Sequence, residues 1–243
     1  MRLLVSVSSA AEASAALAGG ADVIDAKDPL SGALGAVSVD VLRDIHAASA
    51  GARPVTAALG DAADEAAIED AARVFAAAGA SLVKVGFFGI ASAGRVATLT
   101  AGAVRGARAS GDGTCGVVAV AYADADRAAS LAPAALFEVA ARAGAVGVLL
   151  DTADKDGPGL RALVSARVLA AWVAAAHETG LLVALAGKLT ADDLPFVHDA
   201  GADIAGVRGA ACDGGRTGRV TAERVRLLCG AAGLRRLDLA AER

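Results

Sequence analysis

Short apolar runs alternate along the chain with longer segments of helical period. We expect strands in eight of these runs, near residues 2–7, 21–27, 54–60, 82–87, 116–123, 145–152, 181–187 and 203–208. Between them lie alanine-rich segments, such as 61–78 and 160–178, whose length and period predict helices. Eight strands separated by helices are typical of a closed parallel barrel rather than an open sheet. The pattern therefore predicts an α/β protein with a single-domain (β/α)8 TIM barrel.

A short glycine-led motif recurs between a predicted helix and the strand that follows it. Its four copies begin at Gly20, Gly79, Gly144 and Gly201, before every second strand. Glycine suits the position just after a helix, where the backbone enters the left-handed region. Four and six residues after the glycine every copy is apolar: Ile24 and Ala26, Val83 and Val85, Val148 and Leu150, Ala205 and Val207. Because alternate strand residues share a face, this face is predicted to pack under the helices.

The opposite face of the same strands changes character along its length. Three residues after the glycine it is uncharged: Val23, Leu82, Gly147 and Ile204. Further along it becomes charged: Asp25, Lys27, Lys84, Asp151 and Arg208. In a barrel this face is the interior, and active sites lie at its C-terminal end. We expect these five side chains to converge there, in an active site or in a structural ion-pair network. The active site is favoured, because burying so many ions for stability alone is inefficient.

Length and composition agree with one large soluble domain over residues 1–243. The chain has no Pro/Ser-rich linker, and its 56% hydrophobic and 21% charged residues exclude disorder. Its mean hydropathy of +0.54 reflects 67 alanines, and no apolar run approaches the ~20 residues that span a bilayer. The net charge of −4 argues against general polyanion binding. We therefore expect neither a membrane nor a nucleic acid as partner.

Cysteine usage and the first residues point to a cytoplasmic location. Three cysteines without C-x-x-C spacing are typical of a reduced protein. The apolar start of the chain is interrupted by Ser8 and Ser9, too early for a secretory signal of ~7–15 apolar residues. Alanine-rich helix faces permit self-association, so a homo-oligomer of unspecified size is expected.

Several kinds of catalytic motif are missing from the sequence. His46, His177 and His198 fall in predicted helices, and neither an H-E-x-x-H motif nor a Cys/His cluster is present. No metal site is therefore predicted. G-x-S-x-G, Walker A and G-x-G-x-x-G motifs are also missing from supporting contexts, and no cofactor is expected. The candidates that remain for catalysis are lysine amines and carboxylates.

Lysine is scarce, since only four of 23 basic residues are lysines: Lys27, Lys84, Lys155 and Lys188. Arginine can replace the charge of a lysine but cannot supply a neutral amine. A desolvated lysine among other cations has a lowered pKa, and its neutral amine can attack an aldehyde to form a Schiff base. Lys27 and Lys84 are predicted to lie close together, with Asp25 near enough to move protons. Lys155 adds an amine above the mouth or is a solvated loop residue.

Phosphate recognition is the second predicted theme. Loops after the seventh and eighth barrel strands commonly bind phosphate through main-chain N–H groups and a nearby cation. Here those loops begin with Gly187 and Lys188 and with Arg208 and Gly209, which we predict as phosphate-binding residues. The second loop continues to Gly214, Gly215 and Arg216, which belong to the same predicted phosphate-recognition region. Tyr122, at the end of the fifth strand, either contacts substrate or packs at the rim.

Several segments together resemble a known family. The motifs are 3–6 (LLVS), 20–29 (GADVIDAKDP), 32–35 (GALG), 83–86 (VKVG) and 150–153 (LDTA) with 155–157 (KDG). They are similar to those of (5-formylfuran-3-yl)methyl phosphate synthase, also called 4-HFC-P synthase, whose archaeal members serve methanofuran biosynthesis. The resemblance spans nearly the whole chain. Asp28 departs from the family, which commonly has Asn there, and Lys188 is not one of its required lysines.

The resemblance implies a lyase that condenses two glyceraldehyde 3-phosphates into a phosphorylated furan aldehyde, with loss of phosphate and water. By matching position, Lys27 corresponds to the Schiff-base lysine and Lys84 to the proton acceptor. Asp25, Asp151 and Lys155 match further active-site positions. The implied partner is a small phosphorylated aldehyde. Two alternatives stay open: another class I aldolase-like or transaldolase-like barrel enzyme, and a non-catalytic phosphate-binding barrel.

Overall fold

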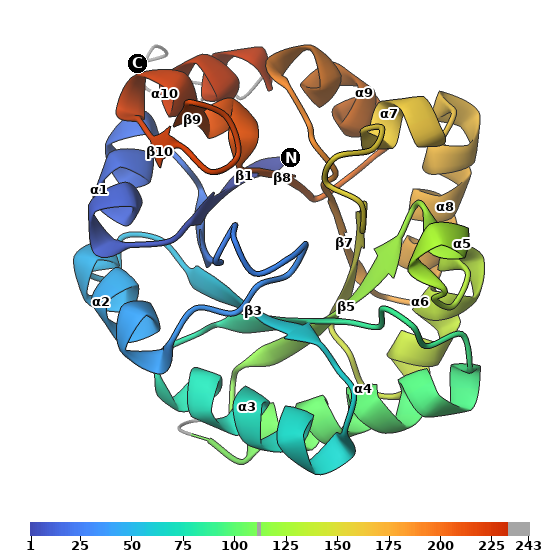
Figure 1. The fold of residues 1–243 in the computed structure, drawn as a ribbon. Helices are drawn as coiled ribbons and strands as arrows, with labels where there is room; N and C mark the ends of the chain where they lie inside the picture. Colours follow the sequence, from blue (N-terminus) through green and yellow to red (C-terminus); the bar gives the residue numbers. More distant parts are fainter. Residues whose placement is uncertain (111–112, 233–243) are drawn as a thin grey trace, which may run out of the picture.

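Eight parallel strands close into a barrel in the computed structural model, which describes residues 1–110 and 113–232 (Figure 1). The strands follow one another around the barrel in chain order, and β8 pairs with β1 to close it. Their bounds are β1 (Arg2–Val7), β2 (Val23–Ala26), β3 (Val55–Asp61), β4 (Leu82–Gly86), β5 (Gly116–Tyr122), β6 (Gly147–Asp151), β7 (Leu182–Leu185) and β8 (Ile204–Val207). The predicted TIM barrel is confirmed, with each strand end within about two residues of its expected place. Residues 233–243 of the predicted domain lie outside the described residues.

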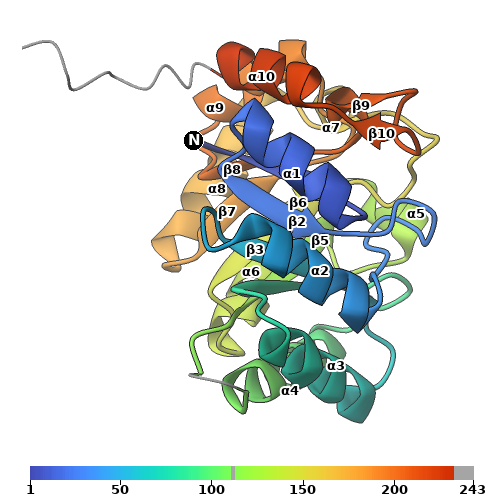
Figure 2. The same ribbon diagram turned by 90° about the vertical axis from the view of Figure 1, so that its left-hand side faces the viewer.

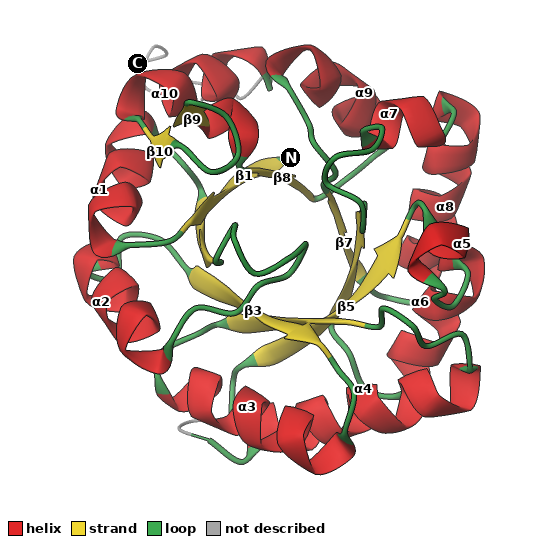
Figure 3. Cartoon of the chain, in the orientation of Figure 1, coloured by secondary structure: helices red, strands yellow, loops and turns green. Residues whose placement is uncertain are grey.

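Helices form a ring around the barrel (Figures 1 and 3). They are α1 (Ala10–Gly19), α2 (Val39–Ser49), α3 (Glu65–Ala77), α4 (Ala93–Arg108), α5 (Ala125–Ala128), α6 (Pro133–Arg142), α7 (Leu160–Leu163), α8 (Ala166–Glu178), α9 (Leu194–Asp199) and α10 (Ala222–Ala231). Side-chain caps start many of them; Ser9, for example, accepts from the Glu12 N–H at the start of α1. No described helix is long and apolar enough to cross a membrane.

One predicted helix is divided in the structure. The segment 160–178 forms α7 and α8, because Val164 adopts an extended conformation and Ser165 caps a new helix by accepting from the Val168 N–H. The three histidines lie in helices, as predicted: His46 in α2, His177 in α8 and His198 in α9.

The repeated glycines end helices in the way the motif predicts. Gly20, Gly79, Gly144 and Gly201 have φ of 97°, 99°, 87° and 90°. These left-handed values are costly for residues with a Cβ atom. Each of the four strands begins three residues after its glycine, so the repeat sets where the strand starts.

Two apolar layers confirm the predicted alternation of strand residues. The outer layer, between barrel and helices, contains all eight residues that were expected there, Ile24 and Val83 among them. A separate inner cluster fills the barrel interior: Leu4, Val23, Ala33, Leu34, Ala58, Val118, Val120, Tyr122, Ala128, Leu149, Ala184 and Ile204. The inner face is therefore packed below the mouth and leaves room for charged groups only at the top.

The loop that joins β2 to α2 folds back over the barrel mouth (Figures 1 and 3). Its Ala33 and Leu34 are buried in the inner cluster. Figure 2 shows the barrel from the side, with this loop, α5 and the hairpin of β9 (Cys212–Asp213) and β10 (Arg219–Val220) gathered at one end. That end carries the candidate site.

Candidate active site

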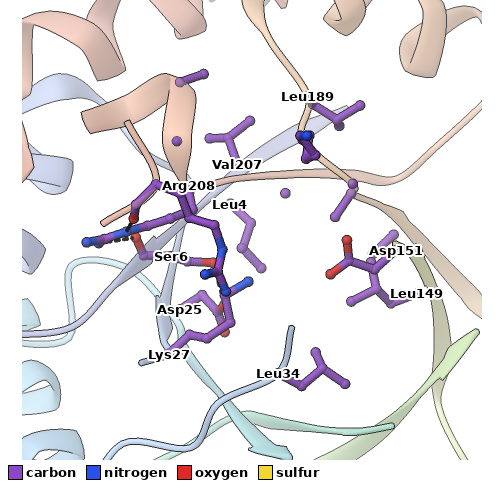
Figure 4. A pocket seen from close by; sticks show the side chains of 18 of the residues that line it. Leu4, Ser6, Asp25, Lys27, Leu34, Leu149, Asp151, Leu189, Val207 and Arg208 are labelled. Carbon is purple, nitrogen blue, oxygen red and sulfur yellow. Dashed lines mark hydrogen bonds between the residues drawn. The ribbon is translucent and has the colours of Figure 1, made fainter. Parts of the chain in front are cut away.

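A pocket of about 390 Å³ opens at the C-terminal mouth of the barrel. Part of its lining is drawn in Figure 4, where Lys27 and Asp25 extend from β2 and Asp151 lies across from them. All nine residues that were predicted as site residues line it: Asp25, Lys27, Lys84, Asp151, Lys155, Gly187, Lys188, Arg208 and Gly209. The predicted convergence of the charged strand ends is confirmed, whereas the chemical roles of these residues stay predictions.

Asp25 is held by groups from three other barrel strands. Lys84 Nζ, from β4, lies 2.5 Å from Asp25 Oδ1. Ser6 Oγ from β1 and Thr56 Oγ1 from β3 each donate to the carboxylate at 2.8 Å. All four side chains are buried. Since every partner lies on a barrel strand, the carboxylate and the amine of this pair have fixed positions.

A second ion pair lies across the mouth, at the end of β6. Lys155 Nζ donates to Asp151 Oδ1 at 2.7 Å, and the Thr152 N–H donates to the same oxygen at 2.7 Å. Burial by itself raises the pKa of Asp151, but the Lys155 and Lys27 ammonium groups outweigh it and hold that pKa below its usual range. Asp151 is therefore a carboxylate at neutral pH.

The loop that carries Lys155 is held by another carboxylate. Asp124, after β5, accepts from the Ala153 N–H at 2.7 Å and from the Asp154 N–H at 2.9 Å. Arg127 forms an ion pair with Asp154 at 3.0 Å. These contacts place Lys155 over the pocket, which favours a site residue over a solvated loop lysine.

Lys27 differs from Lys84 and Lys155 because it is buried without a carboxylate partner. It follows β2 directly, and its side chain is 9% exposed. Within the described part of the chain, no acceptor lies at hydrogen-bond or ion-pair distance from its Nζ. Burial lowers the pKa of Lys27 to about 8; Asp151 raises it, and Lys155 opposes Asp151. A substantial fraction of this amine is therefore neutral near physiological pH.

Arg208 lines the pocket, but its guanidinium is fully engaged with protein acceptors. Its donors reach both oxygens of Glu12, at 2.5 and 3.1 Å, and the carbonyl oxygens of Ser6, Arg216 and Gly218, at 3.0, 3.1 and 2.9 Å. These contacts account for the five N–H groups of an arginine. A phosphate contact through this guanidinium would require one of these bonds to break, so the predicted role of Arg208 stays a prediction.

The loop after β7 has an unusual backbone. Gly187 has φ of 109°, and Lys188 has φ of 57°, in the left-handed region that residues with a side chain rarely enter. Lys188 is exposed at the pocket rim, and its Nζ donates to the Gly157 carbonyl at 2.5 Å. Non-glycine residues in such conformations are concentrated at functional sites.

Tyr122 is a packing residue at the rim rather than a lining residue of the pocket. It is fully buried, and its hydroxyl donates to Asp61 Oδ1 at 2.6 Å. Burial and the Asp61 charge raise the pKa of Tyr122 far above its ordinary value, so the phenol stays protonated. Of the two interpretations of Tyr122, the packing role fits this environment.

Three residues that hold charged groups of the pocket in place were not indicated by the sequence: Ser6, Thr56 and Asp124. Two of them carry a signal that strand register could have provided, since Ser6 and Thr56 lie directly beside Asp25 on the neighbouring strands. Arg216 belongs to the glycine-rich loop after β8, and its position depends on contacts with a distant loop.

Comparison with known sequences identifies a family. Residues 3–229 match the model of the family described as 4-HFC-P synthase. The chain is 42% identical over 219 residues to the (5-formylfuran-3-yl)methyl phosphate synthase of Methanopyrus kandleri, across 90% of this chain and 92% of the relative. It is 38% identical to the protein of the same name from Methanosarcina barkeri, across 94% and 97%. A putative synthase of this name from Streptomyces griseus is 42% identical, across 80% and 78%.

Solved structures similar to this chain are barrels of the same kind. A 3-hexulose-6-phosphate synthase has a TM-score of 0.60 at 25% identity, with 94% of this chain and 99% of that chain covered. The Streptococcus mutans protein KGPDC has a TM-score of 0.66 at 15% identity, with 96% and 97% covered. At that identity the second similarity concerns the fold alone.

Proposed function

Because the chain belongs to the 4-HFC-P synthase family, we propose that it condenses two molecules of glyceraldehyde 3-phosphate into (5-formylfuran-3-yl)methyl phosphate. One phosphate and two water molecules are lost. Family membership and the names of the relatives support the product. The observation that carries the chemistry is Lys27, a buried amine without a carboxylate partner and with a pKa of about 8.

Lys27 begins the reaction by attacking the aldehyde carbon of one triose. The neutral amine adds to C1, and loss of water gives a protonated imine. The carboxylates on either side of Lys27 are already paired with Lys84 and Lys155, so neither forms an ion pair with the Lys27 amine. This favours the attack, because the amine stays available. Arginine at position 27 would keep the charge but remain protonated.

Lys84 is the proposed proton acceptor at C2 of the imine. The iminium cation acidifies this carbon. Removal of the C2 proton gives an enamine, and the electron pair then expels the phosphate at C3. Asp25, anchored by Ser6 and Thr56, holds Lys84 in place for this transfer.

The branching of the product determines which carbons join. Its phosphorylated methyl group branches from a ring carbon, so C3 of the first triose must bond to the central carbon of the second. We propose that the second triose reacts as its 2-keto isomer. This isomer forms when Lys84 moves the C2 proton to C1 and the C2 hydroxyl proton passes to the C1 oxygen. The C3 nucleophile adds to that carbonyl, the C1 hydroxyl closes the ring on C2 of the first triose, and two waters leave. Hydrolysis of the imine returns the water released in its formation and frees Lys27.

Two phosphate groups must be held during this sequence. The predicted ligands are Gly187, Lys188 and Gly209, with Arg208 beside them, all at the rim of the pocket. Anchoring both phosphates would fix the reacting carbons relative to Lys27 and Lys84.

Incubation of the purified protein with glyceraldehyde 3-phosphate alone tests the proposed function. We expect furan absorbance, a product of the composition C6H7O6P in the mass spectrum and one free phosphate per furan. A different class I aldolase-like enzyme would form an imine but no furan, and a non-catalytic phosphate-binding barrel would leave the substrate unchanged. Either result would refute the proposal.

A further inference from the structure

The cations at the barrel mouth differ in whether a carboxylate matches them. Six cationic side chains line the pocket: Lys27, Lys84, Lys155, Lys188, Arg208 and Arg216. Three form ion pairs: Lys84 with Asp25, Lys155 with Asp151 and Arg208 with Glu12. Among the residues that the structure describes, the other three have no carboxylate at ion-pair distance. One of these is Lys27, the proposed imine residue, which leaves Lys188 and Arg216 available to an anion.

Lys188 and Arg216 contact different loops of the mouth, although their own loops are neighbours. Lys188 Nζ donates to the carbonyl oxygen of Gly157, in the loop after β6. Arg216 donates to the carbonyl oxygens of Pro29 and Gly32, in the loop after β2 that folds back over the mouth (Figure 1). The two cations are therefore held by different sets of main-chain carbonyls.

The present partners of Arg216 are weaker acceptors than a phosphate. They are neutral carbonyl oxygens, whereas phosphate oxygens accept charge-assisted hydrogen bonds from the planar guanidinium, often two at a time. These two bonds use two of its five N–H groups, so others remain for a ligand. Burial lowers the pKa of Arg216 and the charge of Asp151 raises it, although no carboxylate of the described residues lies at ion-pair distance.

We propose that Arg216 is the cation of a second phosphate subsite, beside the β2–α2 loop at the mouth of the pocket. This inference rests on the proposed function and deepens it, because two triose phosphates bring two phosphate groups. Lys188 holds one on the β6 side, and Arg216 holds the other. Each of the two phosphate groups then binds one cation that has no carboxylate partner.

The buried pair of Arg208 and Glu12 positions Arg216. Arg208 donates through Nε to the Arg216 carbonyl at 3.1 Å and through Nη2 to the Gly218 carbonyl at 2.9 Å. Glu12 holds Arg208 with both oxygens and also accepts from the Val220 N–H at 3.2 Å. Arg208 thus fixes the main chain at Arg216 and two residues beyond it. It acts through Arg216 as a positioning residue.

Titration with inorganic phosphate, in the absence of triose, tests the second subsite. We expect two phosphates per chain for the wild type and one for each of Arg216→Gln and Lys188→Gln. The affinity of the lost site should fall by about 10- to 100-fold, the range for a hydrogen bond to a charged group. Arg226→Gln is the matched control, because it removes an exposed arginine of α10 outside the pocket and should still bind two phosphates. Wild-type stoichiometry in Arg216→Gln, or a single phosphate on the wild type, would overturn the subsite.

The positioning role of Arg208 has its own readout. Arg208→Lys keeps a charge but loses the fork that holds two carbonyls, so it should weaken the Arg216 subsite and leave the Lys188 subsite unchanged. Equal weakening of both subsites, or no change in either, would contradict positioning. With glyceraldehyde 3-phosphate, Arg216→Gln should raise KM by about 10- to 100-fold. If the wild type forms no furan, the proposed function fails, whereas the phosphate titration still decides the role of Arg216.

Discussion

The two ion pairs on either side of Lys27 are built differently. Asp25 and Lys84 come from barrel strands, and their side chains are 0% and 8% exposed. Asp151 and Lys155 are four residues apart in one segment, and Lys155, on a loop, is 14% exposed. Strand hydrogen bonds fix the first pair, whereas the second depends on how the loop after β6 is held by Asp124.

The two sides of the pocket also differ in how strongly they act on the pKa of Lys27. Asp151 and Lys155 are the two charges that act most strongly on Lys27, and Asp25 acts least among the four charged groups around it. The β6 side therefore acts most strongly on the protonation of Lys27, the proposed nucleophile. The strand-borne pair holds Lys84, the proposed base, at a fixed place, which is what a proton transfer at a carbon atom needs.

Replacement of Lys27, the proposed nucleophile, should have the largest effect on turnover. Unlike the lysines of the two ion pairs, Lys27 is proposed to form the imine. Lys27→Arg keeps the positive charge but cannot form an imine, so turnover should fall by at least about 1000-fold, on the scale seen when a covalent nucleophile is lost. Lys188→Arg is the matched control: if Lys188 serves as a phosphate-binding cation, its charge suffices and turnover should stay near that of the wild type. Initial rates of furan formation check both variants. Full turnover of Lys27→Arg would contradict the mechanism.

The two pairs should also differ in their contribution to stability. Asp25→Asn leaves the buried Lys84 ammonium without its carboxylate and should lower the free energy of unfolding by about 3–5 kcal/mol. Asp151→Asn leaves Lys155, which can move towards water, and should cost less, about 1–3 kcal/mol. Urea unfolding at neutral pH measures both. An equal or larger loss in Asp151→Asn would remove the distinction between a strand-borne and a loop-borne pair.

The pH dependence of the reaction tests which side tunes Lys27. The neutral form of Lys27 increases as pH rises through its pKa of about 8, so the rate of imine formation should rise with a midpoint near that pH. Asp151 raises this pKa, and Asp151→Asn should therefore move the midpoint down. Lys155 lowers it, so Lys155→Met should move the midpoint up.

Asp25→Asn serves as the comparison in the same pH series. Its midpoint should shift down by less than that of Asp151→Asn, because Asp25 is the weakest of the charges that act on Lys27. The relevant measurement is the pH profile of single-turnover imine trapping for each variant. A larger shift of the midpoint in Asp25→Asn than in Asp151→Asn would contradict the conclusion that the β6 side acts most strongly on the pKa of Lys27.

Tyr122→Phe should have the smallest effect. It tests whether a residue that packs at the rim takes part in the reaction. It removes the hydrogen bond to Asp61 and should cost about 1–2 kcal/mol in the free energy of unfolding. Since Tyr122 does not line the pocket, kcat and KM should be unchanged. A fall in kcat without loss of stability would give the phenol a part in the reaction.

Much of this fold was predictable because two signals are local. Strand alternation separated the outer residues from the inner ones, and the repeated glycines marked the helix ends. The same alternation brought Asp25, Lys27 and Lys84 into one pocket. The break between α7 and α8 was missed because Val164 and Ser165 fit the apolar period of a continuous helix, while the local backbone is extended.

The environment of Arg208 shows what the sequence could not predict. Its charge pointed to phosphate, but Glu12 lies 196 residues away in the chain and takes both of its forked donors. Arg216 is separated by a similar distance from the carbonyls of Pro29 and Gly32. Such pairings arise from closure of the barrel, which brings β8 beside β1, and no periodicity within either segment encodes them.

Trapping of the imine is the most direct test of Lys27 as the nucleophile. The wild-type protein is incubated with glyceraldehyde 3-phosphate, reduced with borohydride and digested, and the modified peptide is identified by mass spectrometry. The account predicts one substrate-derived adduct on Lys27, and no adduct in Lys27→Arg. Furan formation by a protein whose Lys27 stays unmodified, with the adduct on another lysine or on none, would contradict it.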